Sequence, residues 1–156
     1  FFFLNKNMST IRITKIFELE MAHALWGYEG PCKNVHGHSY KLFITVIGKI
    51  KEKSSSPKET MVIDFSELKK IVNEKIISKY DHALVLDVNI PGNLKKTANK
   101  MSDKIVYING MPTCEYLAAA FAGILKNAFP SGVELHHLIL QETATSFAEW
   151  YADENT

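Results

Sequence analysis

Alternation of apolar and polar side chains marks the first third of the chain and predicts two long strands. In the run Thr10–His23, glutamates alternate with apolar side chains, which is the period-two pattern of a half-buried strand. The run His36–Ile50 repeats this pattern. We expect the two runs to form an antiparallel pair. Residues 24–35 between them are too many for a tight hairpin and predict a functional loop.

Two later segments have the spacing of amphipathic helices. The first, about Phe65–Lys79, follows Asp64, and Glu67 three residues further on completes a capping-box pattern. The second opens with Thr113 as its N-cap and ends near the Pro-Ser-Gly sequence at 130–132. Both helices have an apolar face, so both are expected to pack on the sheet.

The remaining segments complete the order of elements. Val133–Glu142 and about Phe147–Ala152 are expected to be strands. Residues 87–111 are polar and interrupted by Pro-Gly and Asn-Gly pairs, so we expect a long loop there. The order β-β-α-α-β-β predicts an α+β domain with a mainly antiparallel sheet and two helices on one face.

Composition indicates one globular domain. The 156 residues, of which 46% are hydrophobic and 22% charged, suffice for a real hydrophobic core. The net charge is +1 and the lysines are scattered, so we expect no nucleic-acid partner.

The cysteines and the N-terminus bear on the compartment. Cys32 and Cys114 are the only cysteines and lie on unlike segments, so we expect no disulfide and a cytoplasmic location. The apolar Phe1–Leu4 is too short for a signal peptide, and no later apolar run approaches the ~20 residues of a membrane span. We interpret residues 1–7 as a tag or upstream remnant, and residues 8–156 as a single domain.

Three histidines are the strongest chemical signal in the chain. His36 and His38 share one face of their strand, because side chains at i and i+2 of a strand point the same way. His23 lies on the apolar face of the strand expected to pair with theirs. Three neutral imidazoles would bind zinc and leave one coordination position open, as catalytic zinc sites do. The pattern therefore predicts a zinc site.

Cys32, four residues before His36, leaves three alternatives open. It is a buried small residue, a fourth zinc ligand, or a reactive thiol. The polar loop around it argues against burial, and Lys33 together with a nearby dication would favour the thiolate, the nucleophilic and basic form.

Asp81-His82 and Glu142 are further candidates. The pair closes the first helix, where it is either simply a charged helix end or a carboxylate that orients a proton-exchanging imidazole. Glu142 points with core side chains at a strand end. A carboxylate there is costly unless a partner pairs with it, and a ligand with two adjacent N–H groups would do so.

Six motifs, spread in order from Ile11 to Tyr151, resemble the 6-pyruvoyltetrahydropterin synthase / 6-carboxytetrahydropterin synthase family. They are Ala22-His23, Cys32-x-x-x-His36-Gly37-His38-Ser39-Tyr40, Met61-Val62-Ile63-Asp64-Phe65, Asp81-His82, Pro112-Thr113-x-Glu115 and Gln141-Glu142-Thr143. The resemblance implies the tunnelling fold (T-fold), in which trimers close an antiparallel barrel and stack into a hexamer with active sites at subunit interfaces.

The resemblance also implies the chemistry. It implies zinc as cofactor, held by the three histidines, and 7,8-dihydroneopterin triphosphate as substrate. Cys32 would be the proton-abstracting base, Asp81 and His82 its relay, and Glu142 the anchor for the N–H edge of the pterin. Thr113 and Glu115 would lie near the pterin pocket, although helix capping alone would account for Glu115.

One spacing separates two reactions within the family. Three residues lie between Cys32 and the His-Gly-His motif, as in the bacterial carboxy enzymes of queuosine biosynthesis, whereas animal-type pyruvoyl enzymes tend to have five. We therefore expect a lyase, 6-carboxytetrahydropterin synthase, that releases triphosphate and acetaldehyde. The alternatives are 6-pyruvoyltetrahydropterin synthase and a non-catalytic, zinc-stabilised oligomer. Tyr116 and the long 87–111 segment depart from the family pattern.

Overall fold

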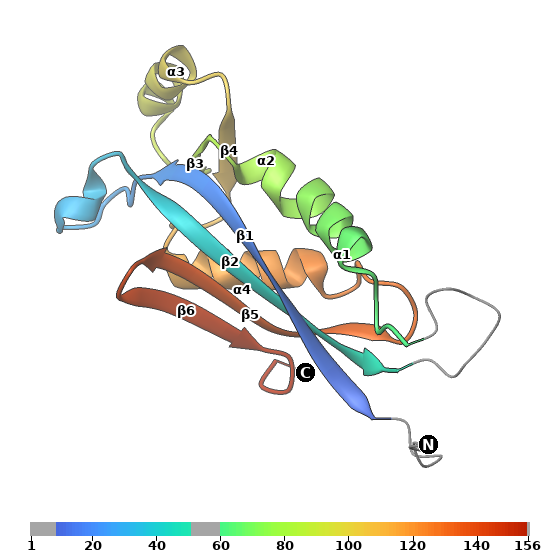
Figure 1. Ribbon diagram of the computed structural model, residues 1–156. Coiled ribbons are helices and arrows are strands. Elements are labelled where there is room, and N and C mark those ends of the chain that lie inside the picture. Colours follow the sequence, from blue (N-terminus) through green and yellow to red (C-terminus); the bar gives the residue numbers. More distant parts are fainter. Residues whose placement is uncertain (1–8, 51–59, 156) are drawn as a thin grey trace, which may run out of the picture.

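A twisted six-stranded sheet forms the body of the protein, as seen in a computed structural model that describes residues 9–50 and 60–155 (Figure 1). The strand order is β4-β3-β1-β2-β5-β6. The strands are β1 (Thr10–His23), β2 (His36–Lys49), β3 (Ala83–Asp87), β4 (Ile105–Ile108), β5 (Val133–Thr143) and β6 (Ser146–Tyr151). The interpretation of residues 1–7 as a tag or remnant lies outside the described residues.

The β1–β2 pair is the longest ladder of the sheet. It is antiparallel and runs from Thr10 opposite Lys49 to His23 opposite His36, which confirms the predicted pairing. β5 continues the sheet antiparallel to β2, and β6 lies antiparallel to β5. β3 and β4 add two parallel pairings at the end of β1 where His23 lies. The ladder thus fixes both histidine-bearing strand ends beside each other.

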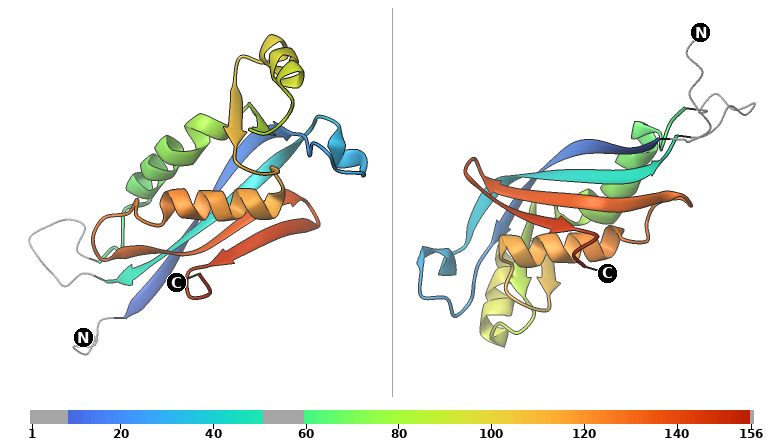
Figure 2. Two further views of the ribbon diagram at one scale, coloured as in Figure 1. Left: turned by 180° about the vertical axis from the view of Figure 1, so that it is seen from behind. Right: turned by 90° about the horizontal axis from the view of Figure 1, so that it is seen from below.

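Two helical segments pack on one face of the sheet (Figure 2). One continuous helical segment consists of α1 (Phe65–Val72), a π-helical stretch (Asn73–Ile77) and α2 (Ser78–Tyr80), and the other helix on this face is α4 (Cys114–Leu125). The Asp64 carboxylate accepts from Ser66 N at 2.7 Å, and Thr113 Oγ1 accepts from Tyr116 N at 3.2 Å. Both predicted N-caps are confirmed.

The core lies between this face and the two helices, as the strand alternation predicts. Its fully buried members include Leu19, Tyr40, Leu42, Leu68, Phe121 and Leu140. The opposite face of the sheet carries mixed polar and apolar side chains, including Ile16 and Phe147, which are 53% and 59% exposed. Among the described residues this opposite face is left uncovered except at β3 and β4, where a smaller apolar cluster lies on it.

The expectation of a loop over residues 87–111 is wrong. This segment contains α3 (Gly92–Met101) and β4, and it ends just before α4. Leu94 and Ala98 of α3 pack with Ile90 and Leu86 in a second, smaller core. These apolar residues follow helical spacing, but lysines, asparagines and the flanking turns conceal the pattern. This part of the chain adds a helix and the parallel strands β3 and β4 to the predicted β-β-α-α-β-β order, which otherwise holds.

Several edge segments of the sheet are unpaired within the described part of the chain. β3 pairs with β1 only at Met21–His23, and the Asp81-His82 turn binds the Glu20 backbone, which leaves the outer edge of residues 10–19 open. The outermost strands are β4 on this side and β6 on the other. Open edges present free backbone donors and acceptors to another chain. No helix among the described residues has the length and apolar character that crossing a bilayer requires.

Candidate active site

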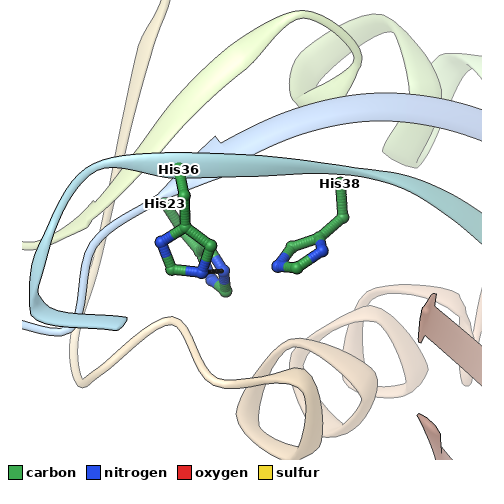
Figure 3. Close-up of side chains that lie close together, drawn as sticks. All are labelled: His23, His36 and His38. Carbon is green, nitrogen blue, oxygen red and sulfur yellow. Dashed lines mark hydrogen bonds between the residues drawn. The ribbon is translucent and has the colours of Figure 1, made fainter. Parts of the chain in front are cut away.

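The three histidines converge at one end of the β1–β2 ladder (Figure 3). His23 lies directly opposite His36, and His38 follows two residues later on the same face. Their ring centroids are 4.5 to 5.3 Å apart, and one ligand nitrogen from each lies within 4.8 Å of the others. The predicted convergence is confirmed.

Two backbone carbonyls orient these rings. His23 Nδ1 lies 2.7 Å from Pro112 O, and His36 Nδ1 lies 2.8 Å from Asn34 O. Because a carbonyl can only accept, each Nδ1 carries its proton and donates it, which leaves Nε2 with its lone pair in the neutral ring. Burial lowers the pKa of His23, and this outweighs the opposing effect of the hydrogen bond to Pro112. His23 is therefore neutral at physiological pH.

The two Nε2 atoms that result are 3.1 Å apart. Neighbouring ligand atoms around a tetrahedral zinc ion, each bonded at ~2.0–2.1 Å, are separated by ~3.3 Å. Three converging imidazoles, two of which have Nδ1 held by a backbone carbonyl and Nε2 deprotonated, are the donor set of a zinc site with an open position. The residues present fit such an ion.

Glu142 lies beside this group. Its Oε1 is 3.7 Å from His23 Nε2 and 3.8 Å from His38 Nε2, and it accepts a 2.9 Å hydrogen bond from the Tyr40 hydroxyl. Burial, and then the Glu142 charge, raise the pKa of Tyr40, so the hydroxyl remains a donor. The Glu142 carboxylate is thus held at the edge of the histidine group.

A hollow of about 510 Å³ opens where β2 and β5 separate. The ladder between these strands ends at Lys41 opposite Gln141. Beyond that pair, His38 and Glu142 both line the hollow. A ligand in this space would meet His38 and the Glu142 carboxylate together.

Cys32 lies in a short 3₁₀ helix (Pro31–Lys33) of the loop before His36. It is half-buried, and its carbonyl accepts from Leu25 N at 3.0 Å. The group of converging ligand atoms contains the three histidines without Cys32, which argues against the fourth-ligand alternative. Cys114 differs: its thiol donates to Leu140 O at 3.1 Å, and burial raises its pKa to about 11. Cys114 is therefore a packed thiol.

The Asp81-His82 pair lies apart from the histidine group. His82 Nδ1 is 3.0 Å from Asp81 Oδ2, and the His82 side chain is 74% exposed. It borders a hollow of about 480 Å³ that Glu20 and Ser39 also line. The side chains of Glu20 and Met21 point to opposite faces of β1, and Met21 is buried on the face that carries His23. The Asp81-His82 pair therefore lies on the other side of β1. Within one chain, the structure does not bring Asp81 and His82 to the histidines.

Comparison with known proteins gives the family. The family model of 6-pyruvoyl tetrahydropterin synthase matches residues 12–153. The chain belongs to this family. A curated relative from Haemophilus influenzae, named 6-carboxy-5,6,7,8-tetrahydropterin synthase, is 35% identical over 89% of this chain and 97% of its own length. One of the same name from Aquifex aeolicus is 33% identical over 88% of this chain and 96% of its length.

Solved structures of the family share the fold. The 6-pyruvoyl tetrahydropterin synthase of Caenorhabditis elegans superposes with a TM-score of 0.65 at 20% identity, covering 93% of this chain and 97% of that one. An uncharacterized Wolinella succinogenes protein gives a TM-score of 0.75 at 19% identity, covering 92% and 99%. The tunnelling fold predicted from the motifs is therefore confirmed, and the chain is an enzyme of the 6-pyruvoyl tetrahydropterin synthase family.

The family motif Pro112-Thr113-x-Glu115 has a structural role in this chain. Thr113 caps α4, and Pro112 O accepts the hydrogen bond from His23 Nδ1. Glu115 is exposed in the first turn of the helix. Three contributors to the site were not predicted as functional residues. The carbonyls of Asn34 and Pro112 carry no sequence signal, whereas Tyr40 shares the strand face of His36 and His38 and could have been inferred from that spacing.

Proposed function

We propose that the protein is a zinc-dependent 6-carboxy-5,6,7,8-tetrahydropterin synthase. It converts 7,8-dihydroneopterin triphosphate and releases triphosphate and acetaldehyde, a lyase reaction of queuosine biosynthesis. The observation that carries zinc dependence is the convergence of three imidazole nitrogens, with those of His23 and His36 freed by backbone carbonyls. The names of the curated relatives and the three-residue spacing between Cys32 and His36 support the carboxy product.

His23, His36 and His38 would hold the zinc ion. When bound, the ion would act as a Lewis acid that polarises oxygen atoms of the substrate side chain. The carbonyls of Pro112 and Asn34 keep two of the ligands in the tautomer that the ion requires.

Glu142 binds the pterin ring in this proposal. Its carboxylate faces the hollow beside His38, and a charge-assisted pair of hydrogen bonds from adjacent ring N–H groups would orient the substrate. Tyr40 supports this role because its hydroxyl fixes Oε1 and leaves the second oxygen for the ligand. Thr113 and Glu115 remain candidates for the rim of the pterin pocket.

Cys32 takes a proton from the substrate side chain, and Asp81-His82 exchanges protons with it or with the substrate. One chain alone does not join these parts, because the pair opens on the other side of β1. We therefore place the active site between copies of the chain, in a hexamer of two stacked trimers. The open edges of β1 and β6 support ring closure, since each offers unpaired backbone to a neighbour.

We place this enzyme in the cytoplasm, acting on a small molecule without a nucleic-acid or membrane partner. The two free cysteines fit a reducing compartment, and a net charge of +1 offers no polyanion-binding surface.

Product analysis tests the proposal. The zinc-loaded protein is incubated with 7,8-dihydroneopterin triphosphate, and both the pterin and the small carbonyl product are identified by mass spectrometry. We expect 6-carboxytetrahydropterin and acetaldehyde in equal amounts. A pterin that retains all its carbon would instead establish the 6-pyruvoyl reaction, and a zinc-loaded hexamer without turnover would establish a non-catalytic role.

A further inference from the structure

The turn that carries Asp81 and His82 holds a strained backbone. His82 has a φ of 58°, and it is the only residue other than glycine with positive φ in the part of the chain that the structure describes. This left-handed conformation costs a side-chain-bearing residue ~1 kcal/mol or more and persists only where surrounding contacts impose it. The contacts around the peptide bond between Asp81 and His82 therefore decide where the imidazole points.

Glu20 of β1 holds one side of this turn. Asp81 Oδ1 accepts from Glu20 N at 2.9 Å, and His82 N donates to Glu20 O at 2.6 Å. These two bonds fix the carboxylate and the His82 amide against the strand. They leave the carbonyl of Asp81, the other end of the strained peptide, to be held from elsewhere.

Lys104 holds that carbonyl. Its ammonium Nζ donates to Asp81 O at 2.6 Å. The backbone of Lys104 is fixed too, because its carbonyl accepts from Leu84 N at 2.9 Å and from Ser102 Oγ at 3.2 Å. Lys104 directly precedes β4 and is bonded to Leu84 of β3, which lies two residues after His82, so its side chain can reach the turn.

Lys104 belongs to the segment of residues 87–111, which forms α3 and β4. The helix and strand of this segment are anchored by the small core around Leu86, Ile90 and Ala98. This core fixes β4 beside β3 and so fixes the start of β4, which Lys104 directly precedes. The segment therefore supplies a contact to the turn in addition to extending the sheet.

We propose that Lys104 is a positioning residue for the Asp81-His82 pair: its ammonium locks the peptide between them and thereby sets the direction of the His82 imidazole. This inference rests on the proposed function, in which the pair exchanges protons during turnover. Lys104 touches neither the histidine group nor Glu142 in the structure, so its effect is expected on the proton-transfer step and not on substrate or metal binding.

The test compares Lys104→Met with two other variants. Lys104→Met keeps the aliphatic stem and removes the donor, Lys104→Arg restores a cationic donor, and Lys100→Met alters an exposed lysine of the same segment as the matched control. We expect Lys104→Met to lower kcat ~10-fold or more, since small misplacements of catalytic groups cost up to ~10²-fold. KM and bound zinc should stay within twofold of wild type, Lys104→Arg should recover most of kcat, and Lys100→Met should match wild type.

Two further measurements separate this inference from the function on which it rests. Hydrogen exchange followed by mass spectrometry should show faster exchange over residues 80–84 in Lys104→Met, whether or not substrate is present. His82→Asn, which keeps a residue tolerant of positive φ, tests the pair itself. Loss of turnover in His82→Asn combined with full kcat in Lys104→Met overturns the role of Lys104 alone. Full turnover in His82→Asn overturns the role of the pair, and the positioning role falls with it.

If Lys104→Met does not fold, Lys104→Gln, which retains one neutral donor, carries the same comparison of kcat and KM. A partial loss of kcat at constant KM supports the proposal. A rise in KM with unchanged kcat contradicts it, because a residue acting through His82 has no contact with the bound pterin.

Discussion

The histidine group and the Asp81-His82 turn are built in opposite ways. His23, His36 and His38 occupy paired positions of a long antiparallel ladder, and His23 is only 3% exposed. The turn is strained at His82, whose side chain is 74% exposed on the other side of β1. The histidine group is complete within one chain. The Asp81-His82 pair is held in place by the same chain, but its side chains point away from it.

This difference separates metal binding from proton transfer. A site completed by strand pairing forms as soon as the chain folds, because every ligand and both orienting carbonyls belong to the same domain. In the proposed function, a pair that faces outward acts only after another copy has brought a thiol or substrate to it. Zinc binding and turnover are therefore expected to respond to different substitutions.

The largest effect is expected from breaking the histidine group. His38→Ala removes one of three ligands, so bound zinc should fall well below one per chain and turnover should fall with it. Metal analysis by mass spectrometry checks this, with His136→Ala as the matched control on β5. Full zinc occupancy in His38→Ala would exclude that residue from the metal site.

The histidine group could be predicted from sequence because strand periodicity alone determines it. Side chains two residues apart share a face, and antiparallel pairing of the two alternating runs brings His23 opposite His36. The same reasoning extends to Tyr40. The carbonyls of Pro112 and Asn34 could not be predicted, because any residue offers a carbonyl and only the folded chain selects which one meets a ring.

The Asp81-His82 turn could be recognised only as a motif. Its direction depends on β3 joining β1 in parallel and on β4 joining β3, and both follow from a segment that the polar sequence of residues 87–111 presents as a loop. The helix in that segment is stabilised by tertiary contacts of Leu94 and Ala98 more than by its own amphipathic pattern. Local sequence therefore gave the residues of the pair but not the side of the sheet on which they lie.

The next largest effect is expected from Cys32→Ala, which sharpens the comparison between metal binding and proton transfer. If the thiolate is the base, turnover should fall at least ~10²-fold, the usual lower contribution of a positioned general base. Zinc content and melting temperature should remain close to wild type, because Cys32 lies outside the converging ligand atoms. Cys114→Ala, which removes the packed thiol, should retain turnover and serves as the control.

Two results of that experiment would redirect the interpretation. Retained turnover in Cys32→Ala would return the cysteine to a loop-packing role. Loss of zinc in the same variant would revive the fourth-ligand alternative and with it the non-catalytic oligomer.

Glu142→Gln tests whether the carboxylate serves the pterin or the metal. Loss of a charge-assisted hydrogen bond weakens binding by ~1.5–3 kcal/mol, so KM should rise ~10-fold or more while zinc stays bound. Tyr40→Phe, which removes only the hydroxyl that holds Oε1, should produce a smaller rise in KM. Since Oε1 lies 3.7 Å from His23 Nε2, a fall in zinc affinity in Glu142→Gln would instead assign the carboxylate to the metal.

The smallest effect is expected from Asp81→Asn, measured as stability. Burial raises the pKa of Asp81, but the Glu20 N–H, His82 and Lys104 lower it by more, so its folded-state pKa lies below the ordinary value of 3.8. A carboxyl whose pKa is depressed by folding stabilises the native state above its unfolded pKa, and this contribution disappears as the pH falls through the folded pKa. Asp81→Asn should therefore melt ~2 °C lower than wild type at pH 7, a modest shift because the group is partly exposed and screened.

The two proteins should converge in melting temperature below about pH 4, where the wild-type carboxyl begins to protonate. A difference that persists unchanged at acid pH would show that the substitution acts through the shape of the strained turn and not through the charge of Asp81.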